Sequence, residues 1–91
     1  MREFVATILV RPRAEVRDPQ GEAVAGALRS LGHAVADVRT GKEIVVRFAA
    51  DDEHRAADAA RAMGDQLLAN PVIEDFDAQV RAAQERPLST G

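Results

Sequence analysis

The chain has 91 residues and no cysteine, with 12 basic and 15 acidic residues and a net charge of −3. This length predicts one domain, near the lower limit for folding alone, and the missing cysteines exclude disulfides and thiolate metal sites. The mixed, mildly acidic charge argues against a polyanion as the main partner, and no segment approaches the roughly 20 apolar residues of a membrane-spanning helix.

The first predicted element is a strand over residues 3–11 that is largely apolar on both faces. One face carries Phe4, Ala6, Ile8 and Val10, and the other carries Val5, Thr7 and Leu9. A strand with one solvent-exposed face alternates apolar and polar residues, so this pattern favours a strand in the middle of a covered sheet. Pro12 cannot donate a ladder hydrogen bond and ends the strand.

A complete helix signal follows. Asp18 is a suitable N-cap, Pro19 suits the first helical position, and Gly32 suits a left-handed C-cap. Gly21, in the first turn, costs up to about 1 kcal/mol relative to alanine in a helix interior. Two explanations stay open: tolerance near a fraying end, or the close approach of another backbone or a ligand. The apolar stripe has helical spacing and consists of Val24, Ala27, Leu28 and Leu31.

The rest of the chain predicts two strands, a second helix and a charged edge strand, at residues 35–39, 43–49, 51–69 and 72–80. Thr40-Gly41-Lys42 is a turn signal between the first two. Asn70-Pro71 ends the helix, because a residue before proline avoids the helical region. We place one domain at residues 1–80 and expect a partly helical or disordered C-terminal tail at 81–91.

The order β-α-β-β-α-β predicts an α+β fold of the ferredoxin-like, split βαβ type. Right-handed crossovers would place two helices on one face of a four-stranded antiparallel sheet. The other face would then expose the second apolar face of the first strand, which is unusual for a monomer. We therefore expect a homo-oligomer or a larger protein partner.

No catalytic, cofactor-binding or metal-ligating residues are predicted. His33 and His54 lack a metal-ligand spacing, and no serine or threonine lies in a nucleophile motif. The neighbouring carboxylates of Glu74 and Asp75 would point to opposite faces of a strand. A phosphate at the start of the first helix would be repelled by Asp18. The three phenylalanines form no RNA-stacking motif.

Three ordered motifs carry a family resemblance: DPQG-x-AV-x-x-AL-x-x-LG from Asp18, DVR-x-GK from Asp37, and LLANPVIEDF at 67–76. In this order they are similar to the small, PurS-type subunit of phosphoribosylformylglycinamidine (FGAM) synthase. The resemblance covers nearly the whole chain, from the first strand to about Val80.

The resemblance implies a noncatalytic subunit of a multi-subunit ligase in de novo purine biosynthesis. Such a subunit bridges the glutaminase subunit and the ATP-dependent synthetase subunit, and assists ammonia transfer between them. ATP and magnesium are then expected in the large partner and no cofactor in this chain. A homodimer or homotetramer in the cytoplasm is expected, without nucleic acid or membrane as a partner.

Matched motif positions outside the core are the predicted partner interface. Each group also has a structural explanation, as a helix cap, a hairpin turn or a helix stop; Gln20, Arg39 and Lys42 have the weakest one. The full set is Asp18, Gln20, Gly21, Arg39, Gly41, Lys42, Asn70, Pro71, Glu74 and Asp75.

Two other functions share the predicted topology. An ACT-like regulatory domain would bind a small molecule at an interface between sheets. An acylphosphatase-like hydrolase would need an arginine phosphate cradle and an asparagine that orients water. Arg11 and Asn70 could supply these groups, but the cradle motif is missing.

Overall fold

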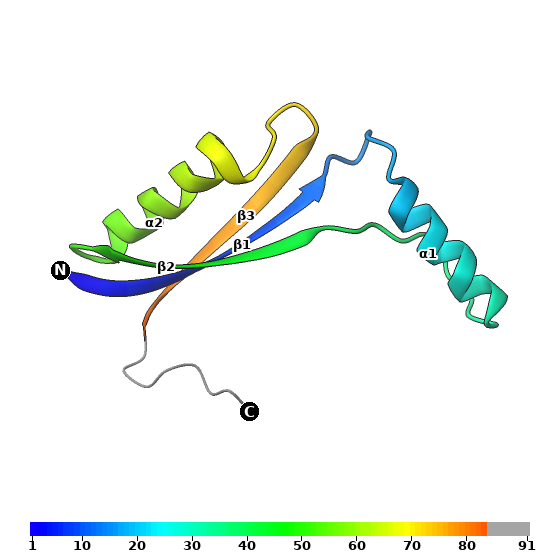
Figure 1. Ribbon diagram of the computed structural model, residues 1–91, viewed down its shortest axis with the longest axis horizontal. Helices are drawn as coiled ribbons and strands as arrows, with labels where there is room; N and C mark the ends of the chain where they lie inside the picture. The colour runs from blue at the N-terminus through cyan, green and yellow to red at the C-terminus, as the bar shows by residue number, and fades with distance from the viewer. Residues whose placement is uncertain (84–91) are drawn as a thin grey trace.

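Three strands form one antiparallel sheet in the computed structural model, which describes residues 1–83. The central strand β1 (Arg2–Pro12) lies between β2 (Lys42–Ala50) and β3 (Glu74–Ala82), as Figure 1 shows. Phe4 lies opposite Phe48 on β2 and Ala82 on β3. The central position predicted for the first strand and the edge position predicted for the last one are both confirmed.

One face of the sheet is covered by α2 (Glu53–Met63) and the π-helical turn η1 (Gly64–Leu68) that continues it. Alanines on the inner side of α2 allow the helix to lie close to the strands, and α2 packs mainly over β3 and β1. The core is built of fully buried or nearly buried residues, chiefly Phe4, Ala6, Ile8, Val10, Ala56 and Ala60. The predicted helix over 51–69 is confirmed, with a wider last turn.

Gly64 lies directly against the ring of Phe76. A Cβ atom at Gly64 would be 2.3 Å from the Phe76 Cε2 atom. We expect Gly64→Ala to destabilise the fold by about 1–3 kcal/mol, the usual cost of overpacking a core. Gly26→Ala is the matched control, because nothing lies within 4 Å of its Cβ position. Thermal melting of the two variants should shift in opposite directions, and equal shifts would contradict this packing.

The first helix, α1 (Pro19–Ser30), forms as predicted but does not pack on the sheet. Asp18 caps its N-terminus, and Gly32 has a φ of +97° just after its C-terminus. Figure 1 shows α1 beyond the end of the sheet. We call residues 18–40 the α1 arm. The radius of gyration is accordingly 16.8 Å, against about 12 Å for a compact chain of this length.

The prediction of four strands with two helices on one face is therefore wrong for this chain in isolation. Residues 35–39 form no strand. The reason is local: the carbonyl groups of Val35 and Ala36 accept hydrogen bonds from the Arg29 guanidinium at 3.0 and 2.9 Å. The segment thus returns along α1 instead of pairing with β2, and residues 40–42 are not a hairpin turn.

The C-terminal part of the prediction is tested only as far as Ala83. Strand β3 begins at Glu74, after a turn, and ends at Ala82. The helical or disordered tail predicted for 81–91 otherwise lies outside the described residues. Within residues 1–83, none of the helices is both long and apolar enough to cross a membrane.

Candidate partner interface

The ten predicted interface residues converge on one end of the sheet. Here β1 ends while β2 and β3 begin, with Val10 opposite Lys42 and Pro12 opposite Glu74. The base of the α1 arm joins the sheet at the same end (Figure 1). Three motifs that are far apart in the sequence are therefore neighbours in space. Their role in binding a partner stays a prediction.

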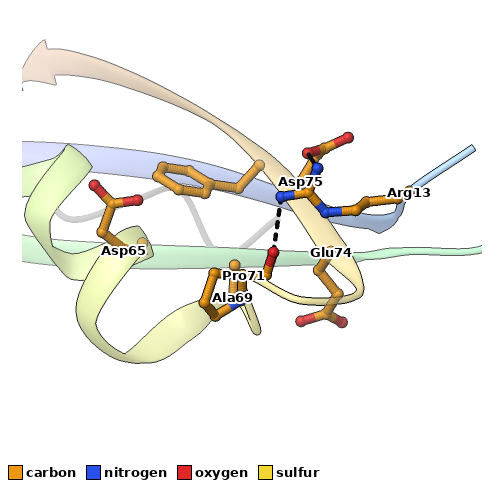
Figure 2. A pocket seen from close by; sticks show the side chains of 8 residues that line it. Arg13, Asp65, Ala69, Pro71, Glu74 and Asp75 are labelled. Atoms are coloured by element: carbon orange, nitrogen blue, oxygen red, sulfur yellow. Dashed lines mark hydrogen bonds and ion pairs between the residues drawn. The ribbon is translucent and has the colours of Figure 1, made fainter.

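A first hollow of about 200 Å³ lies between the turn after α2 and the start of β3. Figure 2 shows Arg13 reaching across it to Pro71 and Asp75. The guanidinium donates to the Pro71 carbonyl oxygen at 2.7 Å and pairs with the Asp75 carboxylate at 3.4 Å. Arg13 was not among the predicted residues, although it anchors two that were.

A second hollow of about 260 Å³ lies between predicted residues of the first two motifs and one of the third. Gln20, Gly41, Lys42 and Glu74 all line it. Gln20 and Lys42 are exposed there, while Gly41 lies against the backbone carbonyl of Val10. The Glu74 carboxylate also accepts a hydrogen bond from the Asn70 backbone N–H at 2.7 Å. Gln20 and Lys42 thus remain available for contacts outside the chain.

Asp18 has an internal role. It is only 6% exposed, and one carboxylate oxygen accepts a hydrogen bond from the Gly21 N–H at 2.9 Å. The other accepts from the Thr40 N–H at 2.6 Å and from the Thr40 hydroxyl at 2.9 Å. The N-cap prediction is confirmed, and the bonds to Thr40 extend it across the arm.

The hydrogen bonds to Asp18, first that from Thr40 N–H and then that from Gly21 N–H, lower its pKa below the ordinary value of 3.8. Because the native pKa is the lower one, the charged form stabilises the arm at pH above 3.8, and this contribution is lost as the pH falls through the native pKa. We expect acid to loosen the α1 arm. An NMR pH titration should show amide shifts of Gly21 and Thr40 moving together below that value, and Asp18→Asn should abolish this step.

Gly21 and Arg39 also act within the chain. A Cβ atom on Gly21 would lie 2.2 Å from the Val38 carbonyl oxygen, so of its two explanations the close approach of another backbone is the correct one. The Arg39 guanidinium donates to the carbonyl oxygens of Arg13 and Val16, both at 2.8 Å. Thr40 is the variable position of the second motif. Its hydrogen bonds to Asp18 were not predicted, because a lone threonine before glycine indicates only a turn.

The two groups considered for an acylphosphatase-like site are engaged elsewhere. Arg11 pairs with Asp77 on the neighbouring strand, and the Asn70 side-chain oxygen accepts from the Val72 N–H at 3.0 Å. Neither faces a phosphate cradle. Among the described residues, no cluster of three or more histidine, cysteine or carboxylate side chains could hold a metal ion.

Residues 5–82 match the family profile described as PurS, phosphoribosylformylglycinamidine (FGAM) synthase. The chain belongs to the PurS family. The subunit PurS of phosphoribosylformylglycinamidine synthase from Mycobacterium leprae is 48% identical over 73 residues, which are 78% of this chain and 87% of the relative.

Solved PurS structures share the fold as well as the sequence. PurS from Thermus thermophilus has a TM-score of 0.83 at 40% identity, covering 90% of this chain and 99% of that one. A chain in the structure of PurLQS from Thermotoga maritima has a TM-score of 0.82 at 33% identity, covering 89% and 100%. The projecting arm and the three-stranded sheet therefore form a PurS-type subunit, and no observation favours an ACT-like domain.

Proposed function

We propose that this PurS-family chain is the noncatalytic small subunit of FGAM synthase, which bridges the glutaminase and the ATP-dependent synthetase and assists ammonia transfer between them. ATP and magnesium are then bound by the synthetase. The observation that carries the proposal is the similarity to a chain of PurLQS over 89% of this chain and 100% of that one. The convergence of three motifs at one end of the sheet supports it, because only side chains in one place can form a common contact surface.

We also propose that the chain self-associates through the α1 arm. Val24 and Leu31 on α1 are 39% and 75% exposed. On the sheet face that α2 covers, β2 offers a strip of only partly buried apolar residues: Ile44, Val46 and Phe48. The arm of one copy is complementary to the strip of another, since both are apolar and about two helical turns long. Such an exchange would place a second helix on each three-stranded sheet, as in the helix layer of the predicted ferredoxin-like arrangement.

The bridging role predicts different requirements for two nitrogen sources. With glutamine as the donor, FGAM formation by the purified synthetase and glutaminase should require this chain. With a high concentration of an ammonium salt, the synthetase should turn over without it. Full glutamine-dependent activity in the absence of the chain would exclude the proposal.

Gln20 and Lys42 are the residues to test for partner contact. We expect Gln20→Ala with Lys42→Ala to reduce capture of the partner subunits, in the presence of ATP, magnesium and glutamine, by about tenfold or more, since each 1.4 kcal/mol of lost contact is a factor of ten. The control is Gln66→Ala with Arg55→Ala, two exposed residues on α2 and η1. Equal capture by both double variants would place the contact elsewhere.

Lys42 also offers a direct probe of the contact. It is the single lysine of the sequence, so an amine-reactive cross-linker can attach to only one side chain of this chain. If the interface lies at this end of the sheet, cross-links from Lys42 should map to the synthetase or the glutaminase. Cross-links restricted to other copies of this chain would assign this end of the sheet to self-association instead.

A further inference from the structure

Four residues tie the α1 arm to its own base. The buried Asp18 carboxylate joins the first turn of α1 to Thr40, which is 22 residues away in sequence. The Arg39 side chain donates hydrogen bonds to the carbonyl oxygens of Arg13 and Val16 and thereby holds the connection that leads from β1 to α1. Gly21 permits the Val38 backbone to lie directly on the helix. We call Asp18, Gly21, Arg39 and Thr40 the arm latch.

The latch lies where it can set the direction of the arm. Thr40 is two residues before β2 begins at Lys42, so the Asp18 carboxylate is fixed close to the end of the sheet. The Arg39 bonds fix the connection from β1 to α1. Arg13 in this connection pairs with Asp75 on β3, and its backbone N–H donates to the carbonyl of Ile73, the residue before β3, at 2.9 Å. Both connections between the arm and the sheet, the one from β1 to α1 and the one into β2, are thus restrained.

Nothing else in the described structure restrains the arm comparably. Helix α1 makes no extensive contact with any strand or with α2, and its stripe is exposed at Val24 and Leu31. A flexible connection would let this apolar stripe turn back onto the partly buried strip at Ile44, Val46 and Phe48 of the same chain. The restraint at the base prevents that movement.

We propose that the arm latch is a positioning device, which holds α1 away from its own sheet and thereby commits its apolar stripe to another copy of the chain. The inference goes beyond the bridging function, because it concerns which chain the arm packs on. A chain without the latch could satisfy the same stripe by itself.

The test measures the direction of the arm by pulsed electron spin resonance. Because the sequence has no cysteine, Ser30→Cys on α1 and Arg55→Cys on α2 give two unique, exposed labelling sites. Labelled chains are diluted with unlabelled ones so that only the distance within one chain is recorded. The intact latch should give one narrow distance distribution. Asp18→Asn should broaden it or add a shorter distance, since an amide places N–H groups against the Thr40 donor.

Thr40→Val and Thr40→Ser form the matched pair. Valine keeps the shape but removes the hydroxyl donor, whereas serine keeps the donor, so only valine should broaden the distribution. Protection of β1 amides from hydrogen exchange reports that the sheet is folded in each variant. If Asp18→Asn does not fold, the threonine pair decides. An unchanged narrow distribution in Thr40→Val, or equal broadening in Thr40→Ser, would overturn the proposal. Neither measurement requires the synthetase or the glutaminase, so a failure of the bridging function is recorded separately.

Discussion

Replacing Ile8 with alanine is expected to lower the free energy of unfolding by about 2–5 kcal/mol, the usual cost of removing a buried aliphatic side chain and leaving a cavity. Ile8 is 0% exposed and lies in the middle of the central strand. Both neighbouring strands pair with β1, so a cavity here is felt by the whole sheet. For a domain of this size, such a loss is a large part of the total stability.

Urea denaturation at a fixed chain concentration would measure this change. Leu9→Ala is the matched control, because Leu9 is the next residue of the same strand, points to the other face and is 39% exposed. We expect Leu9→Ala to cost clearly less than Ile8→Ala. If the two variants lost equal stability in the isolated chain, the face opposite α2 would be covered as fully as the core.

The second large effect is expected on self-association. Val24→Asp with Leu31→Asp places two carboxylates in the exposed stripe of α1, and burying an unpaired charge costs several kcal/mol. Association through the arm should therefore weaken by at least about a hundredfold, at 1.4 kcal/mol for each factor of ten. Light scattering coupled to size exclusion should then record a monomer whose circular dichroism is unchanged.

Ala23→Asp with Ser30→Asp controls for charge on the same helix. Both positions are exposed and neither belongs to the apolar stripe, so the oligomer should persist. An oligomer that survives the Val24 and Leu31 changes would show that the arm is not the contact. A monomer in both double variants would point to a general effect of negative charge.

Local signals in the sequence predicted the elements well, and their arrangement less well. The cap at Asp18, the left-handed Gly32 and the two-faced apolar pattern of β1 all depend on neighbouring residues, and all are confirmed. The direction of α1 depends on bonds between residues 18 and 40. Val35 and Val38 resemble strand residues, and periodicity cannot reveal that Arg29 takes the carbonyl groups of that segment.

The sequence predicted which residues make up the candidate interface, but not which of them contact their own chain and which are available to a partner. Motif positions identified ten residues, and the fold brings them to one end of the sheet. Asp18, Gly21 and Arg39 contact their own chain. This could not be predicted, because a buried carboxylate and a guanidinium between carbonyl groups have no sequence signature. Arg13 lies outside the motifs altogether, so only the structure identifies it as the link between them.

The arm meets the sheet only at its base, and this frees its length to change during evolution. At its far end, Leu31, Gly32, His33 and Ala34 are all exposed and lie outside the strands and α2. Adding or removing a helical turn there would change the reach of α1 by about 5.4 Å without altering any residue of the core. The distance that a subunit spans within an assembly could thus be adjusted while its folding stability stays the same.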